Sequence, residues 1–280
     1  MRTSRRSFGR LGLNALNMRL LVSMLLTLCV ATPAIAQAPA VVNVLYAGSL
    51  VTPMEGPIKD ALRAQGTDFQ GQPGGSKALA HLISARLKTP DVFISVDPTL
   101  VAGLGDKVAS ADTFASTSLG IGWSDKSTDA ALFADVAAGK ESLLDALATP
   151  RLRIGRTDPK LDPKGGYTVA GMKILAGDAG EARILGADDN AMQVFPEEDL
   201  LVRIEGGEAD VGFFYRTEAV ARGLHFLPLP GAASLSDKIT YTIALMKNAP
   251  HPDAASAFVT FIRSGAGKTI LQHAGLEYRP

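Results

Sequence analysis

Cysteine is nearly absent from this chain, since Cys29 is the only one among 280 residues. It lies in an apolar segment near the N-terminus, so the rest of the chain forms no disulfide and offers no thiolate. Histidine is also scarce. The four histidines show no metal-ligand spacing: His81, His225, His251 and His273. These shortages argue against thiol chemistry and against a zinc site.

Long apolar runs are also missing, because Leu20–Ala31 is too short to span a bilayer and no later stretch is longer. Five arginines accompany this run, and the small-x-small sequence Ala34-Ile35-Ala36 follows it. We therefore predict that residues 1–36 are a cleavable export signal and that the mature protein is periplasmic. Ser4–Phe8 resembles a twin-arginine signal, which leaves Sec and Tat export both open.

An excess of positive charge is absent too. The predicted leader holds five of the 28 basic residues and none of the 28 acidic ones, so the remainder is acidic. An acidic protein is a poor candidate for binding nucleic acid or an anionic membrane surface. Any anion that it binds must therefore be held by local dipoles rather than by a basic field.

Strands and helices alternate along the first part of the chain. Val41–Ala47 and Asp91–Val96 are continuous apolar runs, typical of strands buried on both faces. We expect strands at 41–47, 69–72, 91–96, 119–123, 153–156, 209–215, 225–229 and 240–246. We expect helices at 52–64, 77–87, 143–148, 168–175, 197–204, 217–222, 253–262 and 268–274. The opening β-α-β-α-β order predicts a parallel, doubly wound α/β sheet.

Three segments fall where a strand ends and a helix begins: Tyr46–Leu50, Gly74–Ser76 and Arg156–Tyr167. Such a junction leaves the first N–H groups of the helix free, so that it can hold an anion without a charged side chain. A glycine at such a junction lets the backbone approach a ligand closely, and a serine adds a hydroxyl. The alternative is that the serines only cap helices and that Asp158 and Asp162 only form Asp-Pro turns.

A set of motifs, taken in order, resembles the periplasmic molybdate- and tungstate-binding proteins of ABC importers. The matching segments are Tyr46–Leu50, Gly74–Lys77, Pro90–Asp97, Asp162–Gly165, Asp210–Ala219, Tyr241–Leu245 and Ala257–Ile262. The resemblance implies the type II periplasmic-binding-protein fold, with the ligand clamped between two α/β lobes. It places one lobe at residues 40–119 plus 242–280 and the other at 120–241.

The resemblance also implies which residues hold the oxyanion. Hydroxyl donors match Ser49 and Ser76, each beside a glycine (Gly48 and Gly75) whose backbone faces the ligand. Three positions of the second lobe match further donors of the family: the amide of Lys164 or Gly165, an amide where the helix at Glu197 begins, and the phenol of Tyr215.

One departure concerns coordination. The archaeal tungstate-binding branch of this family adds two carboxylates that coordinate the metal. Asp162 matches the first, but Phe214 stands where the second is expected. We therefore expect a tetrahedral oxyanion held by neutral donors. Asp162 would repel a dianion unless it bonds the metal or turns away to cap the helix that follows, and we count it among the ligand-binding candidates. We expect the Lys164 side chain to lie in solvent.

The resemblance implies a monomeric binding protein, without a cofactor, that captures molybdate or tungstate and delivers it to an inner-membrane ABC permease. The same scaffold with sulfate, phosphate or an organic acid is one alternative, and a periplasmic ligand sensor is another. An enzyme is not expected. A hydrolase with Ser49 or Ser76 as its nucleophile lacks a Gly-x-Ser-x-Gly elbow, and the sequence identifies no base for either serine.

Overall fold

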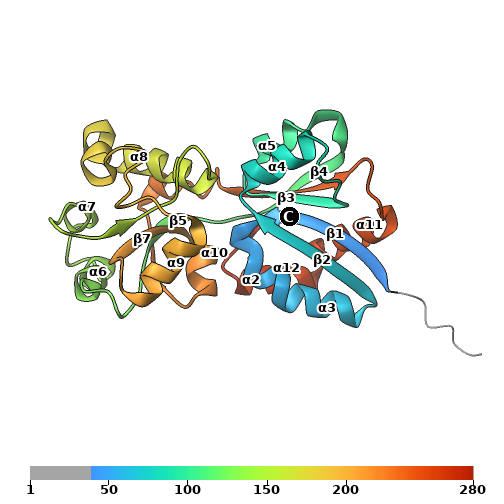
Figure 1. Cartoon of the computed structure of the whole chain (residues 1–280). Coiled ribbons are helices and arrows are strands. Elements are labelled where there is room, and N and C mark those ends of the chain that lie inside the picture. The colour runs from blue at the N-terminus through green and yellow to red at the C-terminus, as the bar shows by residue number, and fades with distance from the viewer. Residues whose placement is uncertain (1–38, 280) are drawn as a thin grey trace, which may run out of the picture. The chain divides into compact units, whose positions relative to one another are not determined.

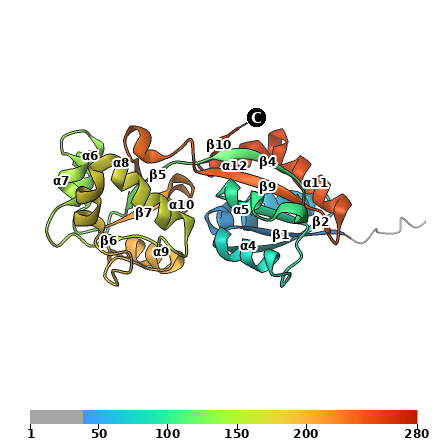
Figure 2. The ribbon, with the colours of Figure 1, turned by 90° about the horizontal axis from the view of Figure 1, so that it is seen from above.

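The computed structural model describes residues 39–279, so the predicted export signal at 1–36 lies outside the described residues. Residues from Pro39 onward form one compact unit. Within the described part of the chain, no helix is both long and apolar enough to cross a membrane. The unit contains two sheets, each with its own helices (Figures 1 and 2).

The larger sheet has six strands in the order β10-β4-β9-β3-β1-β2. Its strands are β1 (Ala40–Ala47), β2 (Thr67–Gly74), β3 (Val92–Ser95), β4 (Val108–Ser116), β9 (Thr240–Met246) and β10 (Glu277–Tyr278). β1 pairs in parallel with β2 and β3, as predicted, but β9 pairs antiparallel with both β3 and β4. The predicted parallel order therefore holds for the opening strands β1, β2 and β3, and the antiparallel strands make the complete sheet a mixed one. β4 escaped prediction because most of its residues are small or polar and exposed.

Alternating side chains of β1 bury both faces of this sheet. Leu45 packs with Phe93 and with Leu79, while Val44 and Tyr46 belong to the core on the opposite face. The helices of this part are α2 (Val51–Pro53), α3 (Lys59–Ala64), α4 (Ser76–Ser84), α5 (Pro98–Ala102), α11 (Pro252–Arg263) and α12 (Gly265–His273). Figure 1 shows α4 and α5 on one side of the sheet and α3 and α12 on the other. The sheet is thus a central layer between helices.

The smaller sheet has four strands in the order β6-β7-β5-β8. They are β5 (Leu119–Trp123), β6 (Ile154–Gly155), β7 (Val211–Tyr215) and β8 (His225–Pro228). The helices of this part are α6 (Ala130–Ala137), α7 (Leu143–Leu147), α8 (Pro163–Leu185), α9 (Glu197–Gly206) and α10 (Arg216–Ala221). Glycine in β5 makes room for aromatic packing, since a Cβ at Gly122 would lie 2.8 Å from the Phe214 ring. Phe214 is fully buried there, beside Leu200 and Ile204 of α9.

Two predicted helices begin at different residues in the structure. The first starts with a 3-10 turn at Gly48–Leu50 and continues through α2, a π-helical turn at Met54–Ile58 and α3. The predicted start at Thr52 is therefore wrong, because the chain is already helical there. α8 starts at Pro163 rather than at 168, because Asp162 and Pro163 supply an N-cap and a first helical residue.

The predicted N-cap role of Ser76 is also wrong. Ser76 is the first residue of α4, whose N-cap is Gly75, and the Ser76 Oγ instead accepts the Val96 N–H at 3.3 Å. α5, α6, β4 and β10 were not predicted. The other predicted helices and strands are present, with ends shifted by a few residues.

A buried carboxylate joins the two short strands β6 and β7. Asp210 is 1% exposed and accepts hydrogen bonds from the Arg153 backbone N–H and Nε, both at 2.9 Å. Burial by itself raises the pKa of Asp210, but the hydrogen bonds from Arg153 outweigh it, so the pKa lies below its usual value. The ionised form of Asp210 therefore stabilises the fold.

We predict that Asp210→Ala lowers the free energy of unfolding by about 2 kcal/mol at neutral pH, because the Arg153 amide loses its acceptor. The contribution of Asp210 is present above its unfolded-state pKa and is lost as the pH falls through its lower folded-state pKa. Urea unfolding at several pH values measures both effects. Asp135→Ala, which removes an exposed pair with Lys140, is the control and should cost less than about 0.5 kcal/mol. Equal losses in the two variants would contradict the prediction.

Candidate functional site

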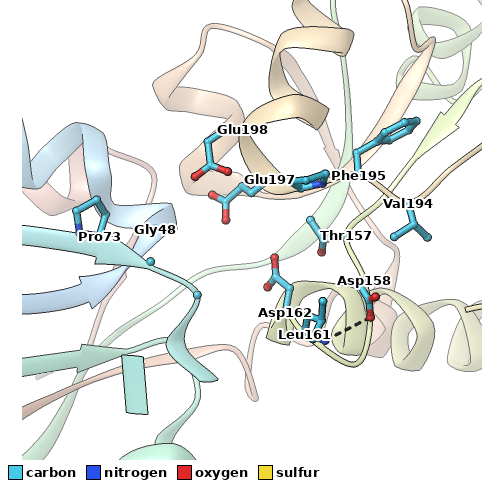
Figure 3. Close-up of a pocket in the computed structure, with 13 residues that line it drawn as sticks. Gly48, Pro73, Thr157, Asp158, Leu161, Asp162, Val194, Phe195, Glu197 and Glu198 are labelled. Atoms are coloured by element: carbon cyan, nitrogen blue, oxygen red, sulfur yellow. Dashed lines mark hydrogen bonds between the residues drawn. The ribbon is translucent and has the colours of Figure 1, made fainter. Parts of the chain in front are cut away.

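A cavity of about 420 Å³ is lined by residues from both parts of the unit (Figure 3). The lining residues are Gly48, Pro73, Gly74, Gly75, Thr157, Asp158, Leu161, Asp162, Val194, Phe195, Pro196, Glu197 and Glu198. A second cavity of about 190 Å³ shares Gly48, Glu197 and Glu198 with the first, and Ser49 also lines it. Each of the three predicted strand-to-helix junctions therefore contributes to the lining of the larger cavity.

The junction after β1 brings backbone close to a carboxylate. Gly48 starts the 3-10 turn, and a Cβ placed there would lie 3.4 Å from Oε2 of Glu197. A Cβ at position 48 would therefore be in ordinary van der Waals contact with Glu197. Gly75 differs, because a Cβ there would meet nothing within 4 Å. Glycine at 75 is thus not required by packing, but it leaves the backbone bare beside the cavity.

The loop before α8 forms the opposite wall. Oδ1 of Asp158 accepts the Lys160 N–H at 2.6 Å, and Oδ1 of Asp162 accepts the Lys164 N–H at 2.8 Å. Asp162 thus caps α8, which is the second of the two roles left open for it. Gly165 is required here, because a Cβ would lie 2.5 Å from the backbone of Asp158. Since the Lys164 amide is already bonded to Asp162, the Gly165 amide is the better placed of the two predicted donors.

A buried cluster of charges lies beside this wall. The Lys164 side chain is 1% exposed, and its Nζ lies 2.8 Å from Oε1 of Glu218. The expectation that Lys164 lies in solvent is therefore wrong. Oε2 of Glu218 accepts the Tyr215 N–H at 2.9 Å. Burial lowers the pKa of Lys164, but the carboxylates of Glu197, Glu218 and Asp162 outweigh it and raise the pKa, so Lys164 stays charged.

Glu197 is the first residue of α9, and its side chain lines the smaller cavity together with Glu218. Burial is the largest cause of a pKa well above the usual value of a glutamate. Lys164 lowers the pKa of Glu197, whereas Glu218 and Asp162 raise it. The site thus combines one ammonium group with several carboxyl groups.

Hydroxyl groups meet next to this cluster. Ser49 Oγ lies 2.8 Å from the Tyr241 hydroxyl, which lies 3.4 Å from Oγ1 of Thr217. Two further buried hydroxyls, on Thr157 and Tyr215, have no hydrogen-bond partner among the described residues. Burying an unpaired hydroxyl costs free energy, so both are placed to serve an acceptor that is not part of this chain.

The predicted site residues divide into two groups. Gly48, Ser49, Gly75, Asp162 and Glu197 line one or both cavities. Ser76, Lys164, Gly165 and Tyr215 line neither cavity, and all four are buried.

Three residues of the site were not predicted: Thr157, Glu218 and Tyr241. Glu218 accepts the Tyr215 N–H at the start of α10, but a tyrosine at that position is not the serine or threonine of a capping-box sequence, so the sequence offered no signal. Tyr241 stood within a recognised motif but had no role assigned. Phe214 lines neither cavity and lies near the Lys164 ammonium group, 5.4 Å from its ring centre.

Two α/β sheets, each with its own helices, and a cavity lined from both give this molecule the two-lobed fold of periplasmic binding proteins. Among solved structures, the periplasmic molybdate-binding protein of Azotobacter vinelandii has a TM-score of 0.64 at 18% identity. The match covers 85% of this chain and 99% of that one. At this identity the likeness establishes the fold.

Residues 42–277 match the family of bacterial extracellular solute-binding proteins, and the chain belongs to that family. A Haloferax volcanii protein named as an ABC transporter molybdenum-binding protein is 32% identical over 230 residues. That match covers 80% of this chain but 66% of the relative, slightly less than two thirds of its length. A molybdate/tungstate-binding protein of Pyrococcus abyssi is 23% identical over 254 residues, covering 73% of each chain.

We predict opposite effects for two Tyr→Phe substitutions in the ligand-free protein. Tyr215→Phe should leave the free energy of unfolding unchanged or raise it by up to about 1 kcal/mol, because it removes a buried hydroxyl without a partner. Tyr241→Phe should lower it by about 1 kcal/mol, because it removes the bonds to Ser49 and Thr217. Denaturant unfolding of both variants measures this. A larger loss in Tyr215→Phe than in Tyr241→Phe would contradict it.

Proposed function

We propose that this protein captures molybdate or tungstate in the cavity between its lobes and delivers the anion to an ABC permease. The observation that carries the proposal is the pair of buried, unpartnered hydroxyls on Thr157 and Tyr215. A ligand rich in hydrogen-bond acceptors satisfies both, and an oxyanion is such a ligand. The two relatives named for molybdenum, molybdate or tungstate support this choice of anion.

The proposed donors come from both walls. Ser49 and Ser76 supply hydroxyls, and the bare backbone at Gly48 and Gly75 lies at the starts of two helical segments. From the other side come the amide of Gly165 or Lys164 in the first turn of α8, the N-terminus of α9 at Glu197, and the Tyr215 phenol. Neutral donors held in a closed cavity bind an anion strongly, because water no longer competes for them.

Closure of the lobes completes the proposed site. Ser76 and Tyr215 line neither cavity, so they reach the anion only after a small movement of one lobe against the other. We place the lobes at residues 40–119 plus 242–280 and at 120–241. The partner is an inner-membrane permease, and the protein acts as a periplasmic monomer after removal of residues 1–36.

Selectivity against sulfate depends on size in this proposal. Sulfate and molybdate carry the same charge but differ in bond length, so a rigid ring of donors distinguishes them by distance. The alternatives are the same scaffold with sulfate, phosphate or an organic acid, or a sensor that passes the liganded state to another protein. Both alternatives use the same donors. Binding experiments with several anions therefore distinguish the first alternative, another anion, from the proposal.

We predict that calorimetry detects one-to-one binding of molybdate and of tungstate with dissociation constants below about 1 μM, and no heat with sulfate. The experiment uses protein that starts at residue 37 and that has been freed of bound ligand by unfolding and refolding. The described unit from Pro39 has its own core and suits this treatment. Binding of sulfate alone would favour the sulfate alternative. The absence of binding heat with both molybdate and tungstate would overturn the proposal.

Removal of single hydroxyls should weaken binding. We predict that Ser49→Ala and Tyr215→Phe each raise the dissociation constant for molybdate about tenfold, because each removes one donor to the anion. Ser256→Ala is the control, since its Oγ donates to the Pro252 carbonyl within α11. An unchanged affinity in both site variants would show that neither Ser49 nor Tyr215 donates to the anion.

A further inference from the structure

Glu197 is the carboxylate at the meeting point of the two walls. It lines both cavities, and its Oε1 and Oε2 lie 3.6 and 3.4 Å from the position of a Cβ on Gly48 (Figure 3). Gly48 belongs to one of the junctions proposed to hold the anion. The Glu197 carboxyl group is therefore a neighbour of any oxyanion bound at that junction.

The charges around Glu197 do not favour a dianion. The groups that face it or share its cavities are Asp158, Asp162 and Lys164 at the start of α8, Glu218 and Arg222 of α10, its neighbour Glu198, and the phenols of Tyr215 and Tyr241. The residues that line the cavities before α4, from Pro73 to Gly75, carry no titratable side chain. Carboxyl groups thus outnumber cations.

The two cations are both engaged elsewhere. Lys164 Nζ lies 2.8 Å from Glu218, and Arg222 pairs with Glu205 at 2.6 Å. The N-terminus of α9 favours an ionised Glu197 through its dipole, whereas the Glu218 carboxylate, which lines the smaller cavity with it, opposes ionisation. A dianion bound beside Glu197 would add negative charge there and so favour its protonated form. Glu197 is therefore positioned to gain a proton rather than to lose one.

We propose that Glu197 takes up one proton from solvent when the oxyanion binds, and that its carboxyl O–H then donates to an oxygen of the anion. This deepens the proposed function and rests on it. The proton converts a repelling carboxylate into a hydrogen-bond donor, and no other group changes its charge. Bonds from a carboxyl O–H to an ionised oxygen are among the stronger ones in proteins.

The sign of the pH dependence follows from this step. Because the complex carries more protons than the free protein, the affinity rises as the pH falls. Between the pKa of Glu197 in the free protein and its higher pKa in the complex, the affinity changes by up to about tenfold per pH unit. From about pH 6.5 to 9 ordinary carboxyl groups stay ionised, and lysine and tyrosine side chains keep their protons. None of the four histidines lines either cavity.

The test is molybdate calorimetry at pH 7.5 in two buffers that differ in ionisation enthalpy, followed by affinities from about pH 6.5 to 9. We expect the wild-type protein to take up close to one proton for each anion bound. Glu197→Gln should still bind molybdate, because the amide also donates, but with no proton uptake and an affinity constant within about twofold across the range.

Glu198→Gln is the matched control, since Glu198 occupies the same turn of α9 and lines the same two cavities. It should keep the wild-type proton uptake and pH slope. Binding by the wild-type protein without proton uptake, or uptake that persists in Glu197→Gln, would overturn the inference while the proposed function stands. The absence of binding to any tested oxyanion would overturn both. Thermal unfolding of the two variants checks that each is folded.

Discussion

The site depends on one buried ion pair, between Lys164 at the start of α8 and Glu218 of α10. Both side chains are almost fully enclosed, and burial of two charges is costly unless their remaining hydrogen-bonding capacity is used. Glu218 meets this requirement in part by accepting the Tyr215 N–H. The pair therefore fixes the start of α10 against the start of α8. It also sets the position of Tyr215, whose phenol has no hydrogen-bond partner among the described residues.

The same pair gives the cavity its electrical character. A lysine engaged with its own carboxylate provides no free positive charge for an anion, so attraction must come from amides, hydroxyls and helix termini. Those donors are present on both walls, while Asp158 and Asp162 are occupied in capping turns of their own wall. Glu197 is left as the carboxyl group that a bound anion must meet. An acidic protein can thus hold an oxyanion without a basic patch.

Local sequence signals predicted much of the fold. β5 and β9 have the predicted bounds, because each is an apolar run rich in β-branched or aromatic residues between clear breaks. Asp162 and Pro163 begin α8, although the prediction placed the start of this helix at residue 168. The role of Ser76 as a helix N-cap was assigned wrongly. A serine just before a helical run reads as an N-cap in the sequence, whether its hydroxyl bonds to its own helix or to another segment, as the Ser76 hydroxyl does to Val96. β4 was missed because its partners β9 and β10 come from the far end of the chain.

The sequence by itself determined the α/β class, the three strand-to-helix junctions and the glycines and serines at them, because these are properties of short segments. Only the tertiary structure decided which charges meet. Lys164, Glu197 and Glu218 lie on three different helices, and nothing in their local sequence distinguishes them from solvated surface residues. Whether a charged side chain is buried and paired depends on the packing of elements distant in the chain. The electrostatics of the site were therefore set by the fold rather than by any motif.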